Sequence, residues 1–139
     1  MKRILVVDDD PPVARLISAA LKAAEIEHII DYCSDGGQGK VKAGQGECDL
    51  ITLDLAMPLM DGFAALEEMK RNPKCAHIPV IVITSHQDAE MHQRALDLGA
   101  TAVLTKPFKP RQAAETLRRA LMGEIEPGGM GPGLKPLGR

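Results

Sequence analysis

Aromatic residues are nearly absent from this chain of 139 residues, which has no tryptophan, one tyrosine and two phenylalanines. Tyr32, Phe63 and Phe108 are too few and too scattered to form a platform on which nucleic acid bases stack. The formal net charge is -2, so no overall positive charge favours binding to nucleic acid or to an anionic membrane surface. The composition therefore predicts no direct contact with nucleic acid.

Cysteine and long hydrophobic runs are also scarce. Cys33, Cys48 and Cys75 form no C-x-x-C pair, and an odd number of cysteines cannot close a disulfide framework. No apolar run approaches the roughly 18 residues that a membrane span needs. The chain starts with MKR and passes directly into the apolar run ILVV, without the length or cleavage site of a signal peptide. We therefore expect a cytoplasmic protein with reduced thiols and no membrane segment.

Short β-branched runs alternate along the chain with segments of helical period, which is typical of βα units around a parallel sheet. Five strands are predicted, at residues 3–8, 27–33, 50–54, 80–84 and 102–105. Glycines crowd the segment that should hold the second helix, so we expect that helix to be short. The predicted fold class is α/β, a flavodoxin-like doubly wound (βα)5 fold with strand order 2-1-3-4-5.

The composition changes near the C-terminus. Residues 1–122 have the length and apolar content of one domain, whereas residues 123–139 are rich in glycine and proline and hold few apolar residues. Such a segment buries too little surface to offset the entropy of ordering. We therefore predict one domain at residues 1–122, followed by a disordered tail or by a linker to a second domain at residues 123–139.

Polar side chains follow the predicted strands on one side of the sheet. Asp8 and Asp9 follow the first strand, Asp54 ends the third, Thr84 ends the fourth, and Lys106 follows the fifth. In the order 2-1-3-4-5 these four strands are successive neighbours about 4.8 Å apart, and ligands bind beyond their carboxyl ends. The sequence therefore predicts that the carboxylates, the hydroxyl and the ammonium group converge at one edge.

A cluster of carboxylates calls for a counter-charge, because two of them about 4 Å apart repel by roughly 4 kcal/mol at an effective dielectric constant of 20. An all-oxygen ligand set suits Mg²⁺ or Mn²⁺ better than Zn²⁺, and the four histidines have no ligand spacing. A Mg²⁺ ion beside a carboxylate and opposite a lysine is the apparatus of phosphoryl transfer. Asp54 is the predicted acceptor.

Four motifs resemble the receiver domains of two-component response regulators, from about residue 2 to residue 122. They are ILVVDDDP at residues 4–11, LDLAMPLMDG at residues 53–62, ITS at residues 83–85 and KPF at residues 106–108. The resemblance implies a CheY-like phosphoaccepting domain. It would be a phosphorelay switch and not a turnover enzyme, since it accepts a phosphoryl group and slowly loses it by self-dephosphorylation.

The same resemblance implies a role for each site residue. Asp54 would be the phosphoacceptor and a metal ligand, Asp9 a direct ligand and Asp8 a ligand through water. The backbone carbonyl of Ala56 would be a further ligand. Thr84 and Lys106 would contact the phosphoryl group, and the Lys106–Pro107 bond would be cis. Pro58 and Gly62 would shape the loop after Asp54.

The resemblance also implies partners. The phosphoryl donor would be a sensor histidine kinase or a histidine phosphotransfer protein. An output protein would dock on the face formed by the fourth helix, the fifth strand and the fifth helix, and a phosphorylation-dependent dimer is possible in this family. One feature departs from the family, because Val103 stands where receivers commonly carry Tyr or Phe. Ala56 and His86 occupy positions that tune the lifetime of the phosphoryl group in the family.

Other functions fit less well. Phosphatases of the haloacid-dehalogenase type need a second Asp two residues after the nucleophile, where this chain has Ala56. A dinucleotide-binding domain is disfavoured because aspartates, and no G-x-G-x-x-G turn, follow the first strand. A receiver used only for docking is disfavoured by the complete set of site residues. A stand-alone regulator is expected, with a module detached from a DNA-binding regulator, an output enzyme or a hybrid kinase as the alternative.

Overall fold

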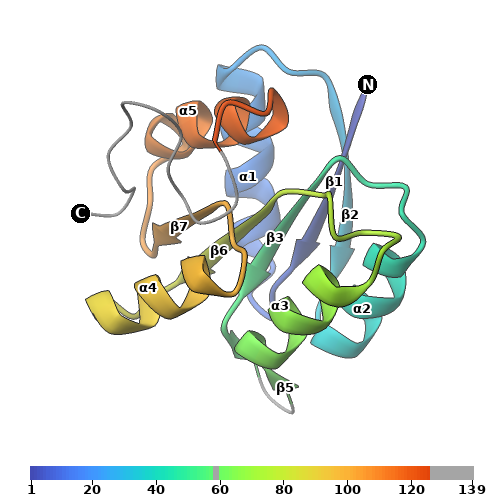
Figure 1. Cartoon of the computed structure of the whole chain (residues 1–139). Coiled ribbons are helices and arrows are strands. Elements are labelled where there is room, and N and C mark those ends of the chain that lie inside the picture. Colours follow the sequence, from blue (N-terminus) through green and yellow to red (C-terminus); the bar gives the residue numbers. More distant parts are fainter. Residues whose placement is uncertain (58–59, 126–139) are drawn as a thin grey trace.

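A five-stranded parallel sheet forms the centre of the computed structural model, which describes residues 1–57 and 60–125. Its strands are β1 (Lys2–Val7), β2 (His28–Cys33), β3 (Leu50–Asp54), β6 (Val80–Thr84) and β7 (Ala102–Thr105). They lie in the order β2-β1-β3-β6-β7, which confirms the predicted order 2-1-3-4-5 (Figure 1). Each predicted strand is found to within a residue at either end.

Helices cover both faces of this sheet (Figure 1). They are α1 (Pro12–Ala23), α2 (Gly36–Gly44), α3 (Gly62–Arg71), α4 (Ala89–Asp97) and α5 (Pro110–Leu121). Two apolar clusters fill the layers between sheet and helices, one under α1 and α5 and the other under α2, α3 and α4. Because both faces are covered, every residue of β3 and β6 is buried. None of the helices among the described residues has the length and apolarity to cross a membrane.

The second helix forms in spite of its glycines. Asp35 caps it, with Oδ1 accepting a hydrogen bond of 2.8 Å from the backbone N–H of Gln38. A Cβ atom at Gly39 would lie 2.7 Å from Cγ2 of Val7, so glycine allows the helix to approach β1 closely. At nine residues α2 is short, as expected, and one of its glycines has a packing role.

Two features lie outside the predicted βα pattern. A small antiparallel pair, β4 (Ala56–Met57) and β5 (Met60–Asp61), directly follows β3 and leads into α3. At the other end, the described chain continues past α5 to Ile125, whose side chain is buried. Pro58 and residues 126–139, where a loop-shaping proline and a tail were predicted, lie outside the described residues.

Candidate functional site

The carboxyl edge of the sheet brings together the acidic residues that the sequence placed there. Asp8 and Asp9 follow β1, and Asp54 is the last residue of the neighbouring strand β3. One carboxylate oxygen from each of these residues lies within 4.8 Å of the other two. Asp8 and Asp54 are buried and Asp9 is exposed, so the cluster has two residues set into the edge and one open to solvent.

Lys106, which follows β7, supplies the positive charge of this cluster. Its Nζ lies 3.0 Å from Oδ2 and 3.3 Å from Oδ1 of Asp8, and 3.5 Å from Oδ2 of Asp54. The ammonium therefore lies between two buried carboxylates that β1 and β3 deliver from distant parts of the sequence. The expected convergence is confirmed for Asp8, Asp9, Asp54 and Lys106.

The electrostatics of Asp8 show that one ammonium does not fully compensate this site. Burial raises the pKa of Asp8, and the hydrogen bonds from Lys106 and from the backbone of Asp10 oppose this only in part. The pKa of Lys106 is also raised, but burial is not the cause. Burial by itself would lower the pKa of its ammonium, but the hydrogen bond to Asp8 and the charges of Asp8 and Asp54 outweigh burial and raise it. Within residues 1–57 and 60–125, three carboxylates here face one nearby cation.

A divalent cation fits the residues of this edge. Oδ2 of Asp8 is buried and accepts no hydrogen bond among the described residues, although Lys106 lies 3.0 Å away, because that contact lacks hydrogen-bond geometry. The ammonium of Lys106 offsets the burial of this carboxylate only in part, because the pKa of Asp8 remains raised. The donors are all oxygens, which is the ligand set that Mg²⁺ prefers. Asp8, Asp9 and Asp54 together could therefore hold Mg²⁺.

The carboxylate of Asp54 is oriented by the chain that follows it. Oδ1 accepts a hydrogen bond of 3.0 Å from the backbone N–H of Ala56, and Oδ2 faces Lys106. Gly62, at the start of α3, packs directly against Leu55, since a Cβ atom there would lie 2.4 Å from the Leu55 Cα. Asp61 caps α3 by accepting a hydrogen bond of 2.9 Å from the backbone N–H of Phe63. Helix α3 thus holds the segment after Asp54 in place.

Thr84 ends β6, on the other side of β3 from Asp8. In the sheet register Asp54 pairs with Ile83, which places Thr84 one residue further toward the edge. Thr84 is fully buried, and its Oγ1 accepts a hydrogen bond of 3.1 Å from the backbone N–H of His86. The structure places Thr84 in the strand beside Asp54, and the hydrogen bond of its hydroxyl is to the following loop. The Lys106–Pro107 peptide bond is cis, as expected.

One buried histidine was not predicted. His92 in α4 is 8% exposed, and its Nε2 lies 2.7 Å from the backbone carbonyl oxygen of His86. Its place between Met91 and Ala95 on the core-facing side of a helix was the available signal. The close Asp8–Lys106 pair was also missed, because strand order predicts a shared edge but no side-chain conformation.

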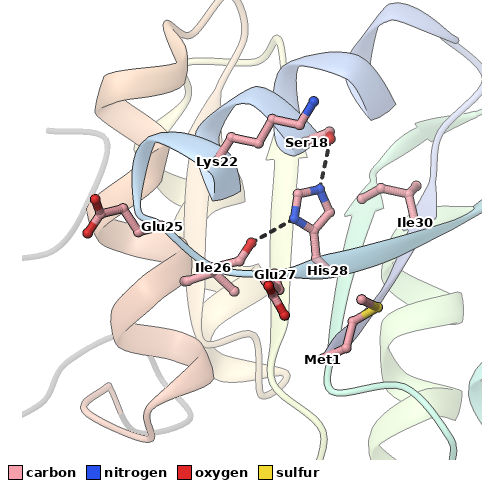
Figure 2. Close-up of a pocket in the computed structure, with 8 residues that line it drawn as sticks. All are labelled: Met1, Ser18, Lys22, Glu25, Ile26, Glu27, His28 and Ile30. Atoms are coloured by element: carbon pink, nitrogen blue, oxygen red, sulfur yellow. Dashed lines mark hydrogen bonds between the residues drawn. The ribbon is translucent and has the colours of Figure 1, made fainter.

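One cavity is remote from this edge. It has a volume of about 590 Å³ and lies beside the C-terminal end of α1 and the start of β2. Figure 2 shows His28 in this cavity, with Nε2 2.8 Å from Ser18 Oγ and Nδ1 2.9 Å from the carbonyl oxygen of Ile26. Both ring nitrogens thus link β2 to the neighbouring helix and loop, which is a structural role.

Comparison with known proteins gives a consistent picture. Residues 4–118 match the family model described as the response regulator receiver domain. The chain is 36% identical over 121 residues to the DNA-binding dual master transcriptional regulator RpaA of Synechocystis sp., covering 87% of this chain and 49% of that protein. Other curated relatives are matched over 13% and 28% of their lengths, so the chain spans half or less of these relatives.

Solved structures share the whole fold. The chemotaxis response regulator CheY4 of Vibrio cholerae superposes with a TM-score of 0.75 at 30% identity, covering 86% of this chain and 98% of that chain. The receiver domain of sensor histidine kinase PA1611 from Pseudomonas aeruginosa PAO1 gives a TM-score of 0.75 at 26% identity, covering 87% and 98%. That structure has a magnesium ion coordinated in its active site cleft.

Proposed function

This chain belongs to the response regulator receiver domain family, and from that premise we propose that Asp54 accepts a phosphoryl group from a phosphohistidine of a partner protein. The observation that carries the proposal is the arrangement around Asp54. Its carboxylate is buried, oriented by the Ala56 N–H, and lies 3.5 Å from Lys106 in a cluster of three carboxylates. We propose a switch and not a turnover enzyme, because Ala56 stands where a phosphatase of the haloacid-dehalogenase type needs a second Asp.

In the proposed step an oxygen of Asp54 attacks the phosphorus atom of the phosphohistidine. The new P–O bond forms as the P–N bond to the donor imidazole breaks, and the imidazole leaves with the electron pair. Lys106 would pair with the phosphoryl oxygens, since its ammonium already lies beside Asp54. Thr84 would donate its hydroxyl to the same group from the adjacent strand. Water then slowly hydrolyses the acyl phosphate.

We propose that Asp9 and Asp54 bind Mg²⁺ (or Mn²⁺) directly, that the Ala56 carbonyl completes the protein ligands, and that Asp8 acts through water. The proximity of the three carboxylates supports this assignment, and so does Oδ2 of Asp8, which contacts the Lys106 ammonium but accepts no hydrogen bond among the described residues. When bound, the cation neutralises charge on the phosphoryl oxygens. Asp8 and Lys106 fix each other's position, which keeps the ammonium at the edge.

The proposed donor is a sensor histidine kinase or a histidine phosphotransfer protein in the cytoplasm. A hollow of about 330 Å³ borders the site and gives a donor apolar surface next to Lys106. Its lining consists of Asp10, Val13, Leu16, Ser85, Lys106, Pro107 and Phe108. The proposed output face is formed by α4, β7 and α5, where a partner or a second phosphorylated copy would dock. We propose residues 1–122 as the receiver and residues 123–139 as a tail or linker.

The mass of the intact protein after incubation with acetyl phosphate tests this function. We expect one phosphoryl adduct that requires Mg²⁺ and is absent from Asp54→Asn. Asp49→Asn is a matched control, because Asp49 is an exposed carboxylate that binds the backbone N–H of Arg3 away from the site. An adduct that persists in Asp54→Asn, or forms equally without Mg²⁺, would contradict the proposal. No adduct from acetyl phosphate or phosphoramidate would leave a docking module as the better account.

A further inference from the structure

We propose that His92 is a positioning residue that fastens helix α4 to the loop following Thr84, so that a movement of Thr84 is passed to α4. This inference rests on the proposed function, since it assigns the route by which a phosphoryl group on Asp54 would change the surface of the domain. The contacts that carry it are two consecutive hydrogen bonds, one at the backbone N–H and one at the backbone carbonyl of His86.

The first contact links α4 to the loop. His92 lies at the end of the first turn of α4, is 8% exposed, and has its Nε2 at 2.7 Å from the carbonyl oxygen of His86. A carbonyl oxygen can only accept a hydrogen bond, so Nε2 must carry a proton and donate it. A buried imidazole that donates at this distance has a defined orientation, and its helix cannot slide past the loop without breaking the bond.

The second contact links the same loop residue to the proposed site. The backbone N–H of His86 donates to Oγ1 of Thr84 at 3.1 Å. If the Thr84 hydroxyl turns toward a phosphoryl group on Asp54, the N–H of His86 must follow it or lose its partner. Either response moves the peptide units on both sides of His86, and the carbonyl of that residue is held by His92. The pair of bonds therefore connects Thr84 to α4 through one residue.

The loop itself is free to respond. Ser85, His86, Gln87 and Asp88 are all exposed, and the hydrogen bonds of this segment among the described residues are made by His86 and Asp88. Asp88 caps α4 by accepting a hydrogen bond from the N–H of Glu90 at 2.9 Å. A displacement of the loop would therefore reach α4 through its capping residue and through His92.

The apolar packing of α4 does not supply the same link. Ala95, Leu96 and Val103 are buried in one apolar cluster, and Val103 is 2% exposed on β7. Contacts among these small and aliphatic side chains are non-directional, so they hold the helix against the sheet without fixing its position along the loop. The side chain of Val103 is also too small to link the sheet edge to the outer surface by changing its rotamer. The hydrogen bond of His92 is directional, so it fixes the position of α4 relative to the loop.

Nuclear magnetic resonance of the whole chain tests the coupling, with Mg²⁺ and beryllium fluoride as the probe for a phosphoryl group on Asp54. In the wild-type protein we expect amide shifts in residues 84–88 and in α4, together with a shift of the slowly exchanging Nε2 proton of His92. In His92→Phe we expect the loop amides to shift as before and the α4 shifts to fall at least about twofold. One hydrogen bond changes an equilibrium constant by about 2- to 10-fold, and twofold is the lower end of that range.

Three further variants separate coupling from packing. His92→Gln places an N–H donor near the same position and should restore the α4 shifts. Gln93→Ala, at an exposed position on the same helix, should leave them unchanged. His86→Ala should also retain coupling, because it keeps the backbone groups of that residue. Full α4 shifts in His92→Phe, or a loss of coupling in His86→Ala equal to that in His92→Phe, would overturn the inference.

Failure of the proposed function gives a different pattern. If beryllium fluoride and Mg²⁺ shift no amide near Asp54 in the wild-type protein, the acceptor role itself is wrong. If residues 84–88 respond in an Asp54-dependent manner and α4 responds identically with and without His92, the acceptor role stands and the role of His92 is wrong.

Discussion

Replacing Lys106 by methionine removes the positive charge between two buried carboxylates and keeps a side chain of similar length. In the wild-type protein Nζ lies 3.0 Å from Asp8 and 3.5 Å from Asp54, and the Lys106 side chain is only 20% exposed. Lys106→Met therefore leaves Asp8, Asp9 and Asp54 without a nearby counter-charge. We expect the free energy of unfolding in the absence of a divalent cation to fall.

The size of this effect follows from the two distances. At an effective dielectric constant of about 20, charges 3.0 and 3.5 Å apart attract by roughly 5 kcal/mol each. The desolvation of the ammonium group offsets several kcal/mol of this attraction, and breaking a buried ion pair typically costs about 3–5 kcal/mol. We expect Lys106→Met to destabilise the cation-free protein by about 3 kcal/mol near neutral pH.

A lower pH should reduce the difference in unfolding free energy between Lys106→Met and the wild-type protein. The pKa of Asp8 is already raised by burial, and loss of the opposing contribution of Lys106 raises it further. A carboxyl group whose pKa is higher in the folded state stabilises that state while it is protonated, and this contribution is lost as the pH rises through the folded value. The stability deficit of Lys106→Met should therefore be smaller at about pH 5 than at about pH 8.

Mg²⁺ should also reduce the deficit, because a cation at the three carboxylates replaces the missing charge. At a concentration 100 times its Kd, a ligand that binds only the folded state adds about 2.7 kcal/mol. Removal of a repelling ammonium should tighten Mg²⁺ binding, so Lys106→Met should gain more stability from Mg²⁺ than the wild-type protein does.

Urea unfolding followed by circular dichroism, at both pH values and with and without Mg²⁺, measures these quantities. Lys74→Met makes the same charge change at an exposed lysine and serves as the control. If Lys106→Met and Lys74→Met were equally stable without Mg²⁺ at pH 8, Lys106 would not be compensating the carboxylates. If Mg²⁺ stabilised Lys106→Met less than the wild-type protein, the carboxylate cluster would not be the cation site.

The close contact of Gly62 predicts that Gly62→Ala lowers the free energy of unfolding by about 3 kcal/mol, the upper part of the overpacking range, since the added Cβ would meet Leu55 backbone atoms at 2.4–2.9 Å. Chemical denaturation measures the loss, and an unchanged midpoint would show that α3 does not press against the segment after Asp54. Burial raises the pKa of Cys48 to about 11. Alkylation of Cys48 by iodoacetamide at pH 8 should therefore be about 100-fold slower in the folded than in the unfolded protein, and equal rates would refute the raised value.

Much of the fold could be predicted because the pattern of apolar residues follows burial along whole strands and helices. The continuous apolar runs of β3 and β6 reflect a sheet covered on both faces, and their ends were found without error. The two-residue strands β4 and β5 are too short to show any period, so no sequence pattern indicated them. Glycine composition predicted a weak second helix, but could not show that Gly39 is needed for the approach to Val7.

The site was predictable to the level of the strand edge. Strand order alone brings Asp8, Asp54 and Lys106 to the same edge of the sheet, and that convergence was predicted. The pairing of Lys106 with Asp8, closer than with Asp54, depends on side-chain conformations that no spacing encodes. The burial of His92 was missed for a related reason, because residue type argues for exposure while the acceptor that permits burial is a backbone carbonyl six residues earlier.

The contact between Lys106 and Asp8 joins positions 98 residues apart in the chain. A ribosome has made almost the whole domain before Lys106 emerges, and the lysine reaches Asp8 only after β7 has paired with β6 and β3 with β1. Pairings between positions so far apart in the chain form slowly, because loop-closure entropy is lost before the contact stabilises the fold. A nascent, truncated or misfolded copy would display its aspartates as ordinary solvated carboxylates, without the ammonium beside them. The proposed acceptor Asp54 would lack its ammonium partner in such copies, so phosphorylation would be restricted to molecules in which β7 has joined the sheet.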